Sequence, residues 1–405
     1  MSADSTGATI DDVRRSNLAQ VMKIAHQRGP VSRSELAKAT GISRSTIAAL
    51  VADLHERGLV TETHGVAKRV GRPSLVVTAA PTTAAIAINP EVDATHLAIV
   101  TLGGRVVRHV THRHERVPTP GEFLNAVTAI LDGMRPELDA RYRLLGVGVA
   151  VPGLVRADDG TVLLAHHLGW SEVSFTGEMS DAVGLPVYAA NDANCGVMGE
   201  AAFGAGRDLG TIVYLNGGPS GIGGAIAVGG GVLGGHTGHS GEFGHSLVES
   251  SGQPCHCGAV GCLETEVRRD RLLQSVRLDS SRIDELMPAL SRAWLDPSTA
   301  GRQEMQRQIR YLGVALRGIV NSLNPRCVVL GGFLGTLLKV VGEAEIKRAV
   351  GGTLPGGFED LMLRPAALGD EILLVGAAEM VFQPVIDDPT RLSLMPLTAR
   401  VPSLT

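Results

Sequence analysis

Three closely spaced cysteines place the tightest constraint on how this chain can fold. Cys255, Cys257 and Cys262 lie in one short glycine-containing segment, and His245 lies ten residues before the first of them. Thiolates and an imidazole at these spacings suit a closed tetrahedral Cys₃His zinc site. Four protein ligands leave no open position for water, so we expect a structural zinc ion. The alternatives are a reduced cysteine cluster without metal, and His256 in place of His245 as the fourth ligand.

The remaining composition favours a cytoplasmic protein. The chain has five cysteines, an odd number that does not suggest a secreted disulfide framework. No basic segment followed by an apolar run opens the sequence, and no stretch is apolar for long enough to span a membrane. We therefore expect a cytoplasmic location and no membrane partner. Cys195 and Cys327, outside the cluster, are expected to be core residues.

The N-terminal part contains three helical patterns separated by turn signals. The first, Asp12–Arg28, ends at Gly29-Pro30, and the capping box Ser32–Glu35 begins the second. A short turn at Gly41 follows, and Ser43 can cap the third helix. Apolar residues at helical spacing give the first and third helices one inward face each, namely Leu18, Val21, Met22 and Ala25, then Ile47, Leu50, Val51 and Leu54.

Two short helices joined by a glycine turn are typical of a helix-turn-helix, whose second helix enters the major groove of DNA. Lys and Arg outnumber Asp and Glu between residues 13 and 73, whereas the rest of the chain is acidic. This asymmetry indicates that a polyanion binds at the N-terminus. We expect operator double-stranded DNA as a partner; the alternative is a plain three-helix packing module. The expected contacts are Arg44, Ser45, Thr46 and Ala49 to base edges and Arg33 to phosphate.

Two short strand patterns, Leu59–Thr61 and Leu75–Val77, follow the third helix and flank a basic loop. This arrangement predicts the wing of a winged helix. The loop holds Arg69, Gly71 and Arg72, and its Gly-Arg-Pro segment is similar to the core of an AT-hook, which lays an arginine in the minor groove. These three residues are therefore added to the predicted DNA contacts.

From residue 81 onward strand-like and helical patterns alternate, which predicts an α/β fold. Three polar segments in this region suggest a ligand site. Asn191-Asp192 directly follows a predicted strand, where a carboxylate can hydrogen-bond a sugar hydroxyl, although an Asx cap of the next helix is an equally simple interpretation. Glu242 and His245 are three residues apart between glycines, so both can face one small polar ligand. Glu264 follows the last cysteine of the cluster.

Together these segments resemble the ROK family (repressors, open reading frames and kinases), bacterial proteins that include glucokinases and the repressors of xylose and N-acetylglucosamine genes. The resemblance runs from about Arg14 to Val381. It implies a two-lobed actin-like ATPase body, with Asn191, Asp192, Glu242, His245 and Glu264 matching the family's sugar contacts. Asp192 also matches the catalytic base of the family's kinases. His245, Cys255, Cys257 and Cys262 match its zinc ligands, so that His245 serves both the metal and the sugar.

The departures from the kinase pattern concern the phosphates. Family kinases begin the body with Asp-x-Gly-Gly-Thr, a loop around the ATP phosphates, whereas this chain has Asn89-Pro90-Glu91-Val92-Asp93. Glu91 and Asp93 would repel ATP where the chemistry needs positive charge or N–H donors. Pro219-Ser220 stands where kinases tend to have Gly-Thr. His167 replaces the asparagine usual in sugar-binding relatives; it either alters which sugar fits or is neutral.

We therefore expect a sugar-responsive transcription repressor without enzymatic activity, released from its operator by a sugar or sugar phosphate and acting as a homodimer or homotetramer. An ATP-dependent hexose kinase and a ligand-independent DNA-binding regulator with a vestigial cleft remain the alternatives. The expected domains are a winged helix-turn-helix (1–80), a small lobe (81–192) completed by a helix near 370–383, a large lobe with the zinc site (193–369) and a tail (384–405).

Overall fold

The computed structural model describes residues 9–64, 75–218, 221–352 and 359–393. The chain forms two compact units. The first unit comprises Met1–Ala150, Ser174–Ala189 and Ala377–Thr405, and the second comprises Val151–Val173 and Ala190–Gly376. The second unit thus includes residues 151–173, which fall inside the expected small lobe. The domain boundaries expected from the sequence stay a prediction.

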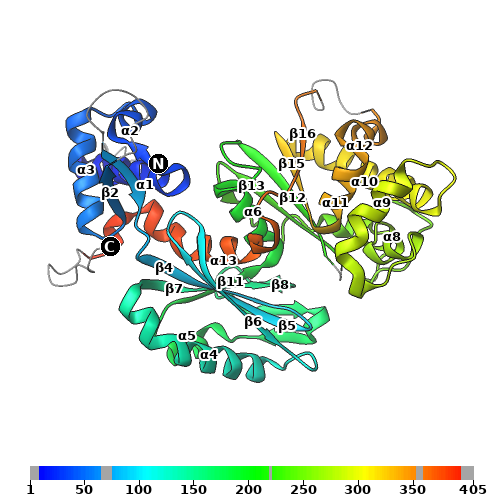
Figure 1. Ribbon diagram of the computed structural model, residues 1–405, viewed down its shortest axis with the longest axis horizontal. Helices are drawn as coiled ribbons and strands as arrows, with labels where there is room; N and C mark the ends of the chain where they lie inside the picture. Colours follow the sequence, from blue (N-terminus) through cyan, green and yellow to red (C-terminus); the bar gives the residue numbers. More distant parts are fainter. Residues whose placement is uncertain (1–8, 65–74, 219–220, 353–358, 394–405) are drawn as a thin grey trace, which may run out of the picture. The chain divides into compact units, whose positions relative to one another are not determined.

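The first unit begins with a winged helix-turn-helix (Figure 1). Its elements in chain order are α1 (Ile10–Arg28), β1 (Val31–Ser32), α2 (Arg33–Thr40), α3 (Arg44–Glu56), β2 (Val60–His64) and β3 (Leu75–Ala79). The three strands pair antiparallel in the order β1-β3-β2. The expected wing loop, with Arg69, Gly71 and Arg72, lies outside the described residues.

Local sequence accounts for the helix boundaries in this module. The Ser32 hydroxyl accepts a hydrogen bond from the backbone N–H of Glu35 at 3.2 Å, and the Glu35 carboxylate accepts one from the N–H of Ser32 at 2.8 Å. This is the expected capping box, and it starts α2. Gly41 ends α2 in the left-handed conformation, with φ of 74°. Ser43 caps α3, as expected. All eight apolar residues expected to face inward on α1 and α3 are buried.

The rest of the first unit is built on one mixed sheet with strand order β11-β7-β4-β5-β6. Figure 1 shows α4 and α5 along one face of this sheet and α13 on the other. On that second face, a Cβ added to Gly148 of β7 would lie 2.0 Å from the Ala377 carbonyl oxygen of α13, so glycine permits this close contact. The elements are β4 (Thr83–Pro90), β5 (Ala94–Thr101), β6 (Arg105–Arg113), α4 (Pro120–Arg141), β7 (Arg143–Val151), α5 (Thr176–Val183), β11 (Val187–Asn191), α13 (Ile372–Asp387) and the 3₁₀ helix η5 (Pro389–Arg391).

The second unit has a five-stranded sheet of order β14-β13-β12-β15-β16 and a small antiparallel sheet of order β10-β9-β8. Buried residues form two core clusters, one that includes α6 and β13 and one that includes α10 and α11. The strands are β8 (Leu154–Val155), β9 (Val162–Ala165), β10 (Trp170–Val173), β12 (Thr211–Gly217), β13 (Ile222–Val228), β14 (Gly231–Val232), β15 (Cys327–Gly331) and β16 (Met362–Pro365). The helices are η1 (His166–Leu168), α6 (Asp192–Ala202), η2 (Phe243–His245), α7 (Leu263–Glu266), α8 (Arg269–Ser275), η3 (Ser280–Glu285), α9 (Leu286–Trp294), α10 (Ala300–Leu323), α11 (Gly332–Val341), α12 (Glu343–Val350) and η4 (Gly369–Glu371).

The α/β fold expected from the alternating patterns is confirmed. Among the described residues, no helix is both long and apolar enough to cross a membrane.

Candidate metal centre and ligand-binding residues

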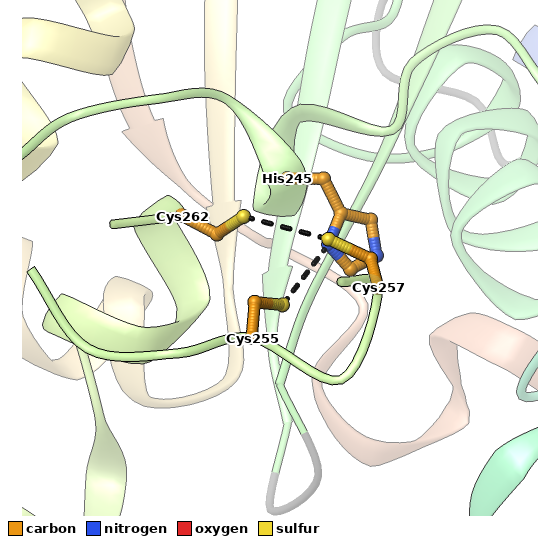
Figure 2. A group of neighbouring side chains, drawn as sticks. All are labelled: His245, Cys255, Cys257 and Cys262. Carbon is orange, nitrogen blue, oxygen red and sulfur yellow. Dashed lines mark hydrogen bonds between the residues drawn. The ribbon is translucent and has the colours of Figure 1, made fainter. Parts of the chain in front are cut away.

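The cysteine cluster converges on one point in the second unit (Figure 2). The ligand atoms of His245, Cys255, Cys257 and Cys262 all lie within 4.8 Å of one another. The Sγ atoms of Cys257 and Cys262 are 3.7 Å apart, and Sγ of Cys255 lies 3.5 Å from Nδ1 of His245. A tetrahedral zinc ion with Zn–S bonds of about 2.3 Å and Zn–N bonds of about 2.0 Å separates its ligand atoms by roughly 3.8 and 3.6 Å. The donor set and its spacing therefore fit zinc.

The protonation chemistry of the thiols fits a dication as well. Burial raises the pKa of the Cys255 and Cys262 thiols, whereas a hydrogen bond from the backbone N–H of Ala259 is the main cause that lowers the pKa of Cys257. Buried thiols with a raised pKa stay protonated at neutral pH unless a positive charge compensates them. A coordinated metal ion supplies that charge and deprotonates its thiol ligands.

Glu264, in the short helix α7 beside the cluster, connects the cysteines to a group of histidines. Its Oε1 lies 3.2 Å from Sγ of Cys255, 3.2 Å from Nδ1 of His256 and 3.6 Å from Nδ1 of His245. His256 thus pairs with this carboxylate, and the group that contains all three cysteines includes His245 and not His256. The ring of His256 also stacks on His166, with centroids 5.1 Å apart and planes 14° apart.

His167 lies at the edge of this histidine group. It is exposed in η1, and its ring packs edge-on against His166, with centroids 5.4 Å apart and planes 88° apart. Because His166 stacks on His256 and His256 pairs with Glu264, His167 belongs to the same surface as the carboxylate. The sequence singled out His167 but not the His166–His256 stack, because ninety residues separate those two rings in the chain.

Asn191 and Asp192 lie at the start of α6. The Asn191 side-chain oxygen accepts hydrogen bonds from the N–H groups of Ala193 at 2.8 Å and Asn194 at 3.2 Å, and its amide donates to the Gly153 carbonyl at 2.9 Å. Asn191 therefore has the helix-capping role that the sequence left open. An oxygen of Asp192 accepts from the same Ala193 N–H at 2.8 Å.

Glycines at the start of β13 lie against three other segments of the second unit. A Cβ added to Gly221 would lie 2.3 Å from Oε2 of Glu264, and one added to Gly223 would lie 3.9 Å from Oδ1 of Asp192. A Cβ on Gly224 would lie 2.3 Å from the carbonyl oxygen of Gly241, the residue that precedes Glu242. Segments distant in the sequence thus lie against this strand, and Gly221 and Gly224 permit the two closest approaches. Pro219 and Ser220, the rest of this turn, lie outside the described residues.

Glu242 begins η2 and is half-buried. Burial is the main cause that raises the pKa of its carboxyl, and nearby His245 and His239 act in the opposite direction. His239 is a residue that the sequence did not single out, and its Nε2 atom is buried without a hydrogen-bond partner. A half-buried carboxyl beside an unsatisfied imidazole nitrogen suits a polar ligand with several hydroxyl groups.

A cavity of about 310 Å³ adjoins this region, a size within the usual range of small-molecule sites. Its lining combines the glycine turn, the Glu264–His256 pair and a basic segment: Gly218, Gly221, Pro254, His256, Glu264, Thr265, Val267, Arg268, Arg269, Asp270 and Phe333. The Arg268 guanidinium and the Asp270 carboxylate form two hydrogen bonds. Nε donates to Oδ1 at 2.8 Å, and Nη2 donates to Oδ2.

The segment that departs from the kinase pattern is a tight hairpin between β4 and β5 in the first unit. Asn89 is buried, and its amide donates to the carbonyl of Ala150 on β7 at 2.9 Å. The N–H of Glu91 donates to the Ala94 carbonyl at 2.8 Å and closes the turn. Burial, followed by the charge of Asp93, raises the pKa of the Glu91 carboxyl. An aspartate at position 89 has no proton to donate to Ala150 at neutral pH.

The predicted DNA contacts on α3 are exposed. Arg44, Ser45, Thr46 and Ala49 lie in its first two turns, around the buried Ile47. The hydroxyls of Ser45 and Thr46 lie 3.0 and 2.9 Å from that of the capping Ser43.

Arg33, the predicted phosphate contact, is partly exposed at the start of α2. It forms a two-pronged ion pair with Glu62 of β2, with 2.7 Å from Nε to Oε1. A carboxylate partner competes with a phosphate for the same guanidinium.

Comparison with known proteins gives consistent matches over nearly the whole chain. The ROK family model matches residues 85–383, and the MarR family model matches residues 15–69. A putative xylose repressor of Caldicellulosiruptor is 27% identical over 395 residues, covering 93% of this chain and 98% of the relative. A glucokinase of Halalkalibacterium halodurans is 29% identical over 311 residues and covers 71% of this chain and 91% of its own length.

Among solved structures, a ROK family transcriptional regulator described as a homologue of the Escherichia coli Mlc protein superposes with a TM-score of 0.74. It is 25% identical, and the match covers 93% of this chain and 97% of that one. The matches to the two regulators extend over the N-terminal module, whereas the match to the glucokinase is shorter.

Proposed function

This chain belongs to the ROK family, and from that premise we propose that it is a sugar-responsive DNA-binding repressor of carbohydrate uptake or catabolism genes. A sugar or sugar phosphate that binds in the kinase-like body releases it from operator DNA. The observation that carries this proposal is the combination, in one chain, of a winged helix-turn-helix, polar residues beside the start of β13 and an acidic hairpin in place of a phosphate loop.

The carboxylates are the proposed sugar contacts. Asp192, Glu242 and Glu264 accept hydrogen bonds from sugar hydroxyls, and His245 donates one through the ring N–H that does not face the metal. Asn191 holds the first turn of α6 and so fixes Asp192 in place. His167 is proposed to influence which sugar binds, because it lies at the edge of the group that includes Glu264.

The cluster of His245, Cys255, Cys257 and Cys262 is proposed to hold a structural zinc ion. When bound, the ion supplies charge that keeps the thiols deprotonated and ties η2 to the segment before α7. That link fixes Glu242 and Glu264 relative to each other, because Glu242 lies just before the ligand His245 and Glu264 lies just after the ligand Cys262.

The winged helix-turn-helix is proposed to bind an inverted-repeat operator as part of a homodimer or homotetramer. Arg44, Ser45, Thr46 and Ala49 contact base edges, and Arg33, released from Glu62, contacts phosphate. Arg69, Gly71 and Arg72 of the wing are proposed minor-groove contacts.

Fluorescence anisotropy with duplex DNA from upstream of the gene tests operator binding. We expect salt-sensitive, nanomolar binding by the wild type and binding at least tenfold weaker for Arg44→Ala, because a bidentate arginine–base contact contributes about 1–3 kcal/mol. Arg292→Ala, on α9 of the second unit, is the control. Equal affinities of Arg44→Ala and the wild type would contradict the predicted interface.

The second candidate function is an ATP-dependent hexose kinase, which the match to a glucokinase favours. We propose that the protein has no such activity, since Glu91 replaces a phosphate-binding glycine and the Asn89 amide is used within the sheet. A coupled assay for ADP release with a panel of aldohexoses distinguishes the two. Turnover near one per second or faster, within the usual range for kinases, would restore the kinase candidate.

A further inference from the structure

The helix α13 connects the two compact units within one element. It runs from Ile372 to Asp387, so that residues up to Gly376 belong to the second unit and residues from Ala377 belong to the first. A continuous helix moves as one body over a few turns, and Pro384, which lacks an N–H donor for the helix, lies beyond Glu379 and Phe382. A shift at one end of α13 therefore reaches its other end.

The second-unit end of α13 packs on α6, the helix that begins with Asp192. A Cβ added to Gly376 would lie 1.7 Å from the Cys195 carbonyl oxygen, and one added to Gly199 would lie 3.1 Å from the Ile372 carbonyl oxygen. The two backbones thus touch, with no side chains between them to absorb a displacement.

Glu200 of α6 fixes the segment that leads into α13. This carboxylate is fully buried, and one of its oxygens accepts hydrogen bonds from the N–H groups of Ala367 at 2.8 Å and Leu368 at 3.1 Å. Its other oxygen accepts from the N–H of Ala205 at 2.5 Å, so an amide at this position must turn its NH2 group toward one of these backbone donors. Glu200 therefore holds α6 and the start of α13 together.

The first-unit end of α13 holds the DNA-binding module through a buried polar pair. Nε2 of His26, near the end of α1, lies 2.9 Å from Oε1 of Glu379, and the two side chains are 0% and 3% exposed. The backbone N–H of Gly103 donates to Nδ1 of His26 at 3.0 Å. Nδ1 is therefore an acceptor, so Nε2 carries the ring proton and donates it to Glu379. The ring of Phe382, also on α13, packs edge-on against His26.

Helix α1 in turn contacts the recognition helix. Arg14 of α1 pairs with Asp53 of α3 at 2.8 Å, and Leu18, Val21 and Met22 are buried in the core that includes α3. A change in the position of α1 on α13 therefore changes the position of α3.

From these contacts we propose that α13 carries the ligand state of the second unit to the DNA-binding module, and that His26 and Glu379 are the positioning residues at its final contact. This proposal rests on the proposed function, in which sugar binding is the change that α13 carries. The chain of contacts itself runs from Asp192 through α6, Gly376, α13, Glu379 and His26 to α1.

Hydrogen–deuterium exchange of the full chain tests this without sugar or DNA. We expect Glu200→Gln, a change confined to the second unit, to raise amide exchange in α1 at least threefold. We expect amide exchange in α1 to be at least tenfold faster in Glu379→Leu than in the wild type. In that background Glu200→Gln should cause no further increase in α1 exchange. Glu379→Gln keeps an acceptor for His26 and should restore most of the protection.

Glu266→Gln is the matched control. Glu266 is also a buried carboxylate of the second unit that accepts a backbone N–H, from Gln253 at 2.8 Å, but its other partner is Arg307 on α10. It should leave α1 exchange unchanged.

Equal effects of Glu200→Gln and Glu266→Gln on α1, or a Glu200→Gln effect that persists in the Glu379→Leu background, would overturn the proposal. If Glu200→Gln does not fold, the milder Glu200→Asp gives the same comparison. Failure of the protein to bind any operator would contradict the proposed function and leave this exchange result readable.

Discussion

Two turns of this protein, the start of β13 and the β4–β5 hairpin, differ in the groups that they can present to a ligand. At the start of β13 in the second unit, Gly221 and Gly224 let Glu264 and the segment just before Glu242 approach one strand closely. At the β4–β5 hairpin in the first unit, the residues that would accommodate a phosphate are replaced by Glu91, Asp93 and a buried Asn89 that donates to Ala150.

The difference concerns the two requirements of a sugar kinase. Binding a sugar requires acceptors and donors arranged around hydroxyl groups, and we propose that residues beside the start of β13 supply them. Transferring a phosphoryl group also requires positive charge or N–H donors at the phosphates, whereas the hairpin holds Glu91 and Asp93. We therefore propose that the protein binds the sugar as a signal and does not phosphorylate it.

The largest expected effect concerns the metal-ligand cluster that supports the β13 region. Cys257→Ser should abolish tight zinc binding and lower the stability of the second unit by about 4 kcal/mol or more, because loss of a metal site is among the most destabilising changes known. Zinc content by mass spectrometry of the purified protein and thermal unfolding measure this. Cys327→Ala, a buried cysteine outside the cluster, should retain zinc. A zinc-loaded Cys257→Ser variant that melts like the wild type would refute the structural role.

The next effect tests how far the hairpin has diverged. Asn89→Asp, which restores the kinase residue, should destabilise the first unit by about 2–4 kcal/mol at pH 7, since a buried carboxylate then faces the Ala150 carbonyl without a proton to donate. Urea unfolding measures the change. The cost should shrink near pH 4, where the protonated aspartic acid can donate. Wild-type stability of Asn89→Asp at pH 7 would mean that the hydrogen bond from the Asn89 side chain to the Ala150 carbonyl contributes little to the stability of the first unit.

A third, smaller effect separates sugar binding from DNA binding. Asp192→Ala should weaken binding of the sugar that titrates the wild type by roughly 10- to 100-fold, the loss expected for a charged hydrogen bond. Operator affinity without sugar should stay within about twofold, since the described contacts between α6 and the segment of α13 are made by Cys195, Gly199 and Glu200, which this change leaves in place. Calorimetry and anisotropy measure the two, with the exposed Asp158→Ala as control. Unchanged sugar affinity in Asp192→Ala would remove this carboxylate from the site.

The smallest effect is the pH dependence contributed by Glu91. Because burial and Asp93 raise its pKa in the folded protein, the folded state binds this proton more tightly than the unfolded state does. The contribution of Glu91 to stability therefore falls as pH rises from its ordinary range, near 4, toward neutrality. Glu91→Gln should lack this decline, so its melting temperature should gain on the wild type between pH 4 and pH 7. A constant difference across that range would show that Glu91 is not perturbed. Glu115→Gln, exposed in the following segment, is the control.

Sequence reasoning succeeded where the determinants are local. The buried faces of α1 and α3 follow from helical spacing, and Ser32, Glu35 and Gly41 cap α2 through contacts a few residues apart. The grouping of His245 with the three cysteines was also accessible, because metal ligands have narrow spacing rules.

It failed where long-range packing decides. The close approach of Glu264 to Gly221 at the start of β13 joins residues far apart in the sequence. The His166–His256 stack and the His26–Glu379 pair join residues far apart in the chain. Single-sequence periodicity carries no information about such pairs.

The most direct test of the central claim is the effect of sugars on operator binding by the wild-type protein. Fluorescence anisotropy with upstream duplex DNA is titrated with a panel of sugars and sugar phosphates at fixed salt. We predict that one of these sugars lowers operator affinity about 5- to 150-fold, the range of a coupling free energy of about 1–3 kcal/mol. Specific operator binding that no member of the panel changes, in a protein whose calorimetry shows no sugar binding, would contradict it.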